Sequence, residues 1–235
     1  MEIKKLFFFD AEWVPVVKDY SELEKKYPLL KDAWDRRCND RWNVERVREG
    51  KDELLPAEYW DNHAFIYPEF NRIICISFGY LSKSGEFKVS SFYDDDEKEI
   101  LNLFNQLLGS VGNKGFILSG YAIKRYDMPW LAKRMMINGI KPSPMLNVYG
   151  KKPWDVQVYD LPEVWGQGCN QESYTPFDWA VVSMGLETPK NDISGAKVKE
   201  CYYKEGKKGL ERIKTYCEQD VLSSYELAKK LIELS

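Results

Sequence analysis

An apolar run near the N-terminus, residues 3–9, constrains the fold more than any other segment. It contains three consecutive Phe residues and is followed at once by Asp10 and Glu12. A short continuous apolar run is typical of a strand that is buried in a sheet. We therefore expect a buried strand here whose C-terminal edge meets Asp10.

Strand and helix patterns alternate after residue 72. In order, the predicted elements are strands at 72–81 and 86–92 around a turn at 84–85, a helix capped by residues 94–96 and ended by Gly109 and Gly112, a strand at 115–120, a helix from 127, a strand at 156–161, a helix at 175–186, a polar Lys-rich loop at 187–208 and a long amphipathic helix at 209–233. Period-two and helical spacing of apolar residues, with turn residues between them, support these assignments. The order predicts an α/β fold in which a mixed sheet is flanked by helices.

Residues 15–69 differ in character from the rest of the chain. Between Lys18 and Asp61 there are ten basic and twelve acidic residues, with Trp residues among them. The spacing is helical and is broken at Pro28. We predict a helical insertion after the first strand, packed through its Trp residues, within a single domain of residues 1–235.

The cysteines and the net charge limit the kinds of metal site, cell compartment and partner that we expect for this chain. The five Cys residues include no C-x-x-C pair, and the single His, His63, has no Cys spaced near it as a metal ligand. This disfavours a structural zinc site and favours reduced thiols in a cytoplasmic protein. We expect no signal peptide and no membrane partner, because no apolar run is long enough to span a bilayer. At a net charge of −3, a polyanionic partner would need local basic patches or metal ions.

Four carboxylates and one tyrosine are candidates for chemistry, and each also has an ordinary explanation. Asp10 and Glu12 are two apart, so on a strand they point to one face, where a divalent cation would relieve their repulsion. Asp127 precedes Met and Pro at a helix start, which is also the position of an N-cap. Tyr216 and Asp220 share one face of the final helix. Alone, they would be a half-buried tyrosine and a solvated aspartate.

Together, these motifs resemble a known family. D-x-E follows the first strand, Y-D-x-P stands at a strand-to-helix junction, and Y-x-x-x-D occupies the final helix. The set resembles the DEDD superfamily of 3′–5′ exonucleases, and the tyrosine resembles its DEDDy subclass. The segments "FFFDAEW", "SGYAIKRYDMP" and "YCEQDVLSSYEL" resemble the proofreading exonuclease domain of family B DNA polymerases in a small stand-alone form. The resemblance covers residues 3 to about 232 except 15–69, and it implies a ribonuclease H-like fold.

The resemblance also implies a catalytic arrangement. Asp10, Glu12, Asp127 and Asp220 would hold two divalent metal ions, Mg²⁺ or Mn²⁺, and Tyr216 would position the attacking water. In a two-metal mechanism, Asp10 would bridge both ions. Glu12 and Asp220 would complete the site of the nucleophile-side ion, and Asp127 that of the leaving-group side.

The sequence indicates the substrate-binding residues less clearly than the catalytic ones. The candidate substrate-binding residues are Ala11, Trp13, Tyr126, Lys197 and Lys199. Trp13 would stack on a terminal base or pack against the insertion. The two lysines lie in a segment, Glu187–Lys214, with eight basic and five acidic residues, and would contact phosphates or be solvated. Ala122 stands where the family often has an Asn that helps to hold substrate.

The expected function is a metal-dependent 3′–5′ exonuclease that acts on single-stranded DNA 3′ ends in proofreading or repair, alongside replication or repair proteins. The chain is too short to carry a polymerase domain as well. Two alternatives stay open: an exoribonuclease of the same fold, and a catalytically inactive nucleic-acid-binding or scaffold protein.

Overall fold

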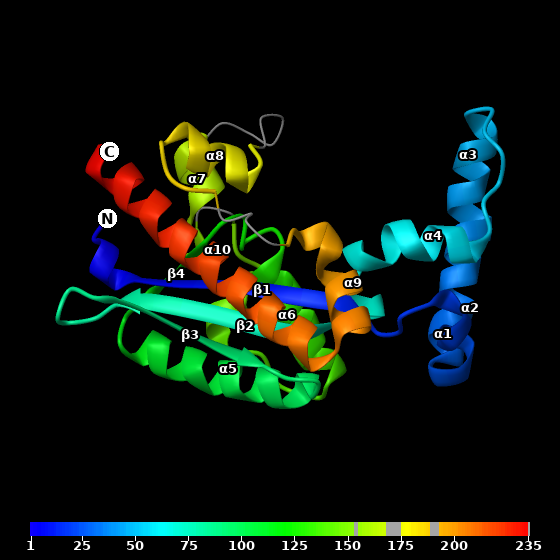
Figure 1. Ribbon diagram of the computed structural model, residues 1–235, viewed down its shortest axis with the longest axis horizontal. Coiled ribbons are helices and arrows are strands. Elements are labelled where there is room, and N and C mark those ends of the chain that lie inside the picture. The colour runs from blue at the N-terminus through cyan, green and yellow to red at the C-terminus, as the bar shows by residue number, and fades with distance from the viewer. Residues whose placement is uncertain (153–154, 168–174, 189–192, 235) are drawn as a thin grey trace. The chain divides into compact units, whose positions relative to one another are not determined.

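The computed structural model describes residues 1–152, 155–167, 175–188 and 193–234, which fall into two compact units (Figure 1). The first unit comprises Met1–Glu12 and Ile73–Ser235, and the second is the intervening segment Trp13–Arg72. The first unit contains most of the sheet and every candidate catalytic residue. The second unit corresponds to the predicted helical insertion.

The sheet is mixed and has β1 at its centre. Its strands are β1 (Leu6–Pro15), β2 (Asn71–Leu81), β3 (Phe87–Tyr93), β4 (Ile117–Gly120) and β5 (Val158–Asp160). The strand order is β3-β2-β1-β4-β5. β2 and β3 form the predicted antiparallel hairpin, whereas β1 pairs parallel with β4, and β4 with β5. Both parallel pairs need crossover connections, and helices supply them.

Helices flank this sheet, as predicted. They are α5 (Glu97–Asn113), α6 (Asp127–Ile137), α7 (Leu161–Trp165), α8 (Phe177–Ser183), α9 (Gly195–Glu205) and α10 (Lys207–Leu234), with short 3-10 helices η1 (Ile3–Lys5) and η5 (Pro144–Leu146). Asp96 caps α5 by accepting from the backbone N–H groups of Lys98 and Glu99. Within the described ranges, no helix combines the length and apolar character that crossing a bilayer requires.

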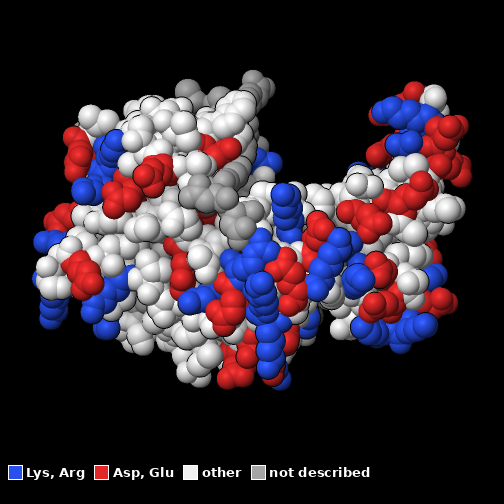
Figure 2. Space-filling model, in the orientation of Figure 1, with Lys and Arg blue, Asp and Glu red and all other residues white. Residues whose placement is uncertain are grey.

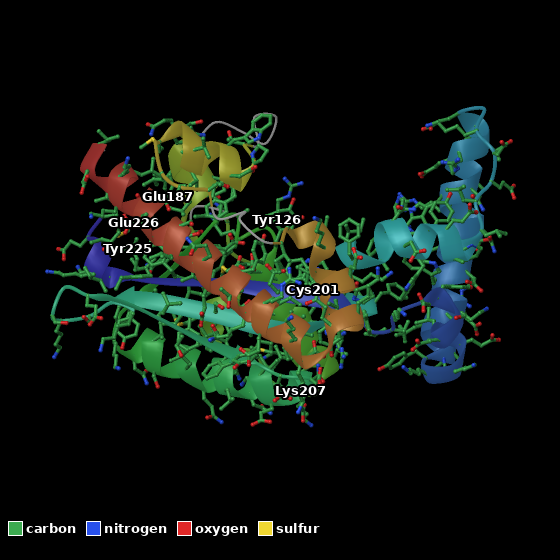
Figure 3. The ribbon with its side chains drawn as sticks, viewed as in Figure 1. Tyr126, Glu187, Cys201, Lys207, Tyr225 and Glu226 are labelled. Carbon is green, nitrogen blue, oxygen red and sulfur yellow. The ribbon has the colours of Figure 1, made fainter. Side chains whose placement is uncertain are left out.

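β1 packs through both of its faces. On one face Phe8 meets Tyr225 of α10 edge-on, with ring centroids 5.8 Å apart; Tyr225 is labelled on α10 in Figure 3. On the other face Phe9 contacts Phe104 of α5, with centroids 5.5 Å apart. Alternation along the strand therefore directs the two acidic residues that follow toward α10.

The first strand extends further than the sequence predicted. We expected it at residues 3–9 with Asp10 at its edge, but β1 runs from Leu6 to Pro15. The buried side chains of Ala11 and Val14 continue the packing beyond the apolar run. Asp10 and Glu12 consequently lie within β1, the central strand of the sheet.

The predicted loop at 187–208 is wrong over most of its described part, because α9 occupies Gly195–Glu205. Val198, Cys201 and Tyr202 are buried at helical spacing, so the helix is amphipathic although lysines dominate its composition. Cys201 is labelled on this helix in Figure 3.

The predicted end of α5 at Gly109 and Gly112 is also wrong, since the helix continues through both glycines to Asn113. A Cβ atom at Gly112 would lie 3.1 Å from the sulfur of Met145. This glycine permits close packing and does not end the helix. The turn comes at Gly115, which has a positive φ of 73°.

A buried ion pair joins α5 to α6 in the first unit. Glu97, in the first turn of α5, accepts hydrogen bonds from Arg134 Nε at 2.8 Å and from Asn138 Nδ2 at 2.9 Å. It also accepts from the backbone N–H of Ile73 on β2 at 2.8 Å. Because each carboxylate oxygen has donors, the charge is compensated in the interior.

The second unit is helical and is built around tryptophans, as predicted. Its elements are α1 (Tyr20–Lys26), α2 (Pro28–Arg37), a π-helical segment η2 (Cys38–Asn43), α3 (Val44–Arg48), α4 (Pro56–His63), and the 3-10 helices η3 (Ala64–Ile66) and η4 (Pro68–Phe70). Trp34 is buried and lies edge-on to Trp42 and Trp60, with centroids 5.2 Å away in each case.

Candidate active site

Three carboxylates from opposite ends of the chain converge beside β1. Asp10, Glu12 and Asp220 each have an oxygen within 4.8 Å of the oxygens of the other two. A divalent cation binds oxygen ligands at about 2.0–2.6 Å, so ligands of one ion lie up to about twice that distance apart. The carboxylate donors and their spacing therefore fit a hard cation such as Mg²⁺ or Mn²⁺.

α10 places Asp220 because the helix buries one side along its whole length. Ile213, Cys217 and Val221 form part of its apolar stripe against the sheet. Asp220 adjoins this stripe and is only 8% exposed. The alternative interpretation of Asp220 as a solvated surface charge is therefore wrong. Tyr216 lies one turn earlier and is hydrogen-bonded to Asp220.

Asp127 approaches β1 from the start of α6. Its Oδ1 atom accepts a hydrogen bond from the backbone N–H of Ala11 at 3.1 Å. The N-cap of α6 is Tyr126, and Asp127 is the first helical residue. The carboxylate thus bonds the strand between Asp10 and Glu12, and it also accepts from the backbone N–H of Asp127 itself at the start of the helix. Among the described residues, Asp127 is not part of the three-carboxylate group defined above.

Burial and mutual repulsion raise the pKa values of these carboxyl groups. Burial is the largest cause for Asp10, whose pKa lies well above its usual range, followed by the charges of Asp127, Asp220 and Glu12. The pKa of Glu12 is raised in the same way, by burial first and then by Asp220. Burial also raises the pKa of Asp127 to about 7, although the backbone N–H groups of Asp127 itself and of Ala11 oppose the rise. Bound cations would relieve this repulsion.

Tyr216 and Cys217 keep their protons in this acidic setting. Burial, together with the charges of Glu12 and Asp220, raises the pKa of Tyr216. Burial also raises the pKa of Cys217, whose thiol donates to Asp10 Oδ2 over 3.3 Å. Tyr216 is consequently suited to donate or orient a hydrogen bond, and not to act as a base.

The buried carboxylate of Asp160 supports the turn before Asp127. Asp160, at the end of β5, is 4% exposed and accepts from the backbone N–H of Lys124 at 3.1 Å and from that of Ala122. Ala122 has a positive φ of 60°, a conformation that L-residues other than Asn and Asp rarely adopt. Burial raises the pKa of Asp160 to about 6.

The candidate substrate-binding residues lie in four different settings. Ala11 is buried, and its backbone is engaged by Asp127. Trp13 belongs to the second unit and donates from its indole nitrogen to the carbonyl of Phe65 at 3.0 Å. Tyr126, labelled in Figure 3, is 36% exposed and carries the Arg125 guanidinium 5.3 Å from its ring centroid.

The candidate lysines are both on α9 rather than in a loop. Lys197 is exposed, whereas Lys199 is partly buried. Figure 2 shows basic side chains interspersed with acidic ones over α9 and the first turns of α10. The basic excess predicted from the sequence is therefore spread through a mixed surface.

A comparison with protein families places the chain in a family. Residues 63–233 match the family described as "Predicted 3'-5' exonuclease related to the exonuclease domain of PolB". The chain belongs to this family. The match includes Asp127, Tyr216 and Asp220 but begins after Asp10 and Glu12. The structure joins these two groups, since Asp10 and Glu12 meet Asp220.

A solved structure shares the fold of this chain. The family B DNA polymerase from the hyperthermophilic archaeon Pyrobaculum calidifontis aligns with a TM-score of 0.56 and 15% identity, over 97% of this chain. The alignment covers 24% of the polymerase chain. The mixed sheet and this similarity confirm the predicted ribonuclease H-like fold. No curated protein matches the chain.

Two buried side chains beside the site were missed by sequence reasoning. Cys217 falls in the predicted helix at 209–233 and Asp160 in the predicted strand at 156–161, and the sequence indicates no role in the site for either. The sequence does place Asp160 at the end of an apolar run, like Asp10, and that position was the available signal. Nothing in the sequence distinguishes the thiol of Cys217 from an ordinary buried cysteine.

Proposed function

We propose that this chain is a metal-dependent 3′–5′ exonuclease that hydrolyses phosphodiester bonds at the 3′ ends of single-stranded DNA. The observation that carries the proposal is the convergence of Asp10, Glu12 and Asp220 within 4.8 Å in a chain of the PolB-related exonuclease family. Buried carboxylates that repel one another are costly without cations. Their retention in one place supports a metal site.

Asp10, Glu12 and Asp220 would hold one divalent ion, and Asp127 with Asp10 a second. Two such ions lower the pKa of a bound water and stabilise the leaving 3′ oxygen. Backbone N–H groups of Ala11 and of Asp127 itself bond the Asp127 carboxylate and would orient it for this purpose. These hydrogen bonds restrict the carboxylate to one orientation.

Tyr216 would orient the attacking water. Its hydroxyl stays protonated because burial and the neighbouring carboxylates raise its pKa. Its hydrogen bond to Asp220 holds the ring beside the acidic group. A phenylalanine at this position should therefore slow hydrolysis while leaving metal binding largely intact.

Tyr126 and Trp13 would stack on bases, and Lys197 and Lys199 would contact phosphates. Stacking and backbone contacts accept any base, so we expect weak sequence preference. Because this family is related to the exonuclease domain of a polymerase, we place the activity in proofreading or repair, with replication or repair proteins as partners.

A 3′-labelled single strand incubated with Mg²⁺ or Mn²⁺ tests the proposal. Wild type should release mononucleotides, Asp10→Asn should not, and Asp155→Asn, which removes an exposed carboxylate elsewhere in the first unit, should match wild type. Equal rates for wild type and Asp10→Asn would refute the assignment. A matched RNA strand decides between DNA and RNA, since the site must accommodate the 2′-hydroxyl.

A further inference from the structure

A buried row of thiols and hydroxyls leads from Asp10 to the protein surface. Cys217 Sγ lies 3.3 Å from Asp10 Oδ2 and is in hydrogen-bonding contact with the thiol of Cys75. Cys75 Sγ lies 3.7 Å from Ser77 Oγ, which lies 2.8 Å from Ser91 Oγ. The row ends where Ser91 donates to Glu218 Oε1 at 2.7 Å.

The two ends of this row have defined directions. Each thiol or hydroxyl has one hydrogen to donate. Cys217 donates toward Asp10, and Ser91 donates to Glu218. Cys75 and Ser77 supply the hydrogens for the links between these two ends.

The donating direction of Cys217 commits its single hydrogen to Asp10. The same thiol lies 3.4 Å from the carbonyl oxygen of Asp10, slightly farther than from the carboxylate oxygen. Cys217 is fully buried on α10, so its position is set by helix packing. Asp10 Oδ2 is thereby held toward the interior, and Oδ1 remains for a ligand.

We infer that Cys217 is a positioning residue for Asp10, orienting this carboxylate for a divalent cation through its thiol hydrogen bond. The inference rests on the proposed metal site and adds a residue that touches neither metal nor substrate. The plain alternative is that Cys217 fills space like any buried cysteine. Cys75 provides a matched comparison, because it is equally buried and its removal leaves the Asp10 link intact.

Isothermal titration calorimetry of Mn²⁺ alone into the full chain tests the inference. Groups that orient a metal ligand typically contribute 10–100-fold to affinity, and a thiol is a weak donor, so Cys217→Ala should weaken Mn²⁺ binding by about 10-fold. Cys75→Ala should change it by less than about twofold, since the link from Cys217 to Asp10 stays intact. Cys217→Ser keeps a donor and should restore most of the affinity. Equal losses in Cys217→Ala and Cys75→Ala would overturn the inference.

Infrared spectroscopy of the wild-type protein gives a second readout of the Cys217 hydrogen bond. The S–H stretching band of a hydrogen-bonded thiol is visible by infrared spectroscopy. The band should shift when Mg²⁺ binds, and Cys75→Ala should retain this shifting band. An unchanged spectrum on metal binding contradicts the inference.

These measurements separate the inference from the proposed function. If wild type binds Mn²⁺ but releases no nucleotide, the nuclease assignment fails, and the affinities of the two cysteine variants still decide the role of Cys217. If wild type cleaves DNA and both variants match one another in affinity and rate, the nuclease assignment stands and the positioning role is refuted.

Discussion

Replacing Asp127 by Asn should stabilise the metal-free protein while disabling the acidic site. Burial, with repulsion from Asp160 and Asp220, raises the pKa of Asp127 from its ordinary 3.8 to about 7. Asn has the same shape, and its side-chain oxygen can still accept the hydrogen bond from Ala11 that Asp127 accepts at 3.1 Å. The substitution therefore removes a buried charge and little else.

The sign and the size follow from the two pKa values. A carboxyl group with a higher pKa in the folded state binds its proton more tightly there, so stability is lost as pH rises from about 4 to about 7. The difference between 3.8 and about 7 corresponds to a loss of about 4 kcal/mol above this window. Asn bears no such cost, so the variant should gain up to that amount at about pH 8 and little at about pH 4.

Urea unfolding followed by circular dichroism in the presence of EDTA measures this effect. Wild type should unfold at a lower urea concentration at the higher pH, and Asp127→Asn should lose less stability over the same pH range. Asp155→Asn, at an exposed position, should behave as wild type. The reasoning is refuted if the variant and wild type lose stability in parallel. Mn²⁺ at a hundred times its Kd should stabilise wild type by about 2.7 kcal/mol, and the variant less.

Three further substitutions, one of them with a matched control, probe the fold. Glu97→Ala strands its buried arginine partner and should cost about 3–5 kcal/mol in urea unfolding; an unchanged midpoint would show that the pair contributes nothing. Gly209→Ala puts a Cβ atom 2.2 Å from the carbonyl oxygen of Cys201 and should lower Tm, whereas Gly195→Ala, with open space around it, should not. Ala122→Gly releases the strain of a positive φ of 60° and should raise stability by up to about 1 kcal/mol; a lower urea midpoint would contradict this.

The elements that carry the site were predictable because their signals are local. The run of Phe residues required a buried strand, and the i, i+2 spacing puts Asp10 and Glu12 on one face because β1 extends through both residues. The i, i+4 spacing does the same for Tyr216 and Asp220 on the helix. Each relation depends only on the geometry of one element.

The tertiary contacts between these elements were less predictable. The hydrogen bond from Ala11 to Asp127 depends on how α6 meets β1, and no spacing encodes it. The helical spacing of Val198, Cys201 and Tyr202 was present but was outweighed by the surrounding lysines and glycines. The sequence predicts a helix end at Gly112. The glycine is instead explained by the close approach of Met145, a tertiary contact that the sequence does not reveal.

The pairing of β1 with α10 has a consequence for when the site forms. Asp10 and Cys217 are 207 residues apart in the chain yet touch in the fold. During synthesis the strand leaves the ribosome first and the helix long afterwards, so a partly made chain holds two of the three clustered carboxylates without the third. Contacts between such distant segments also form slowly. The three-carboxylate group is therefore complete only after the final helix has been synthesised and has packed against β1.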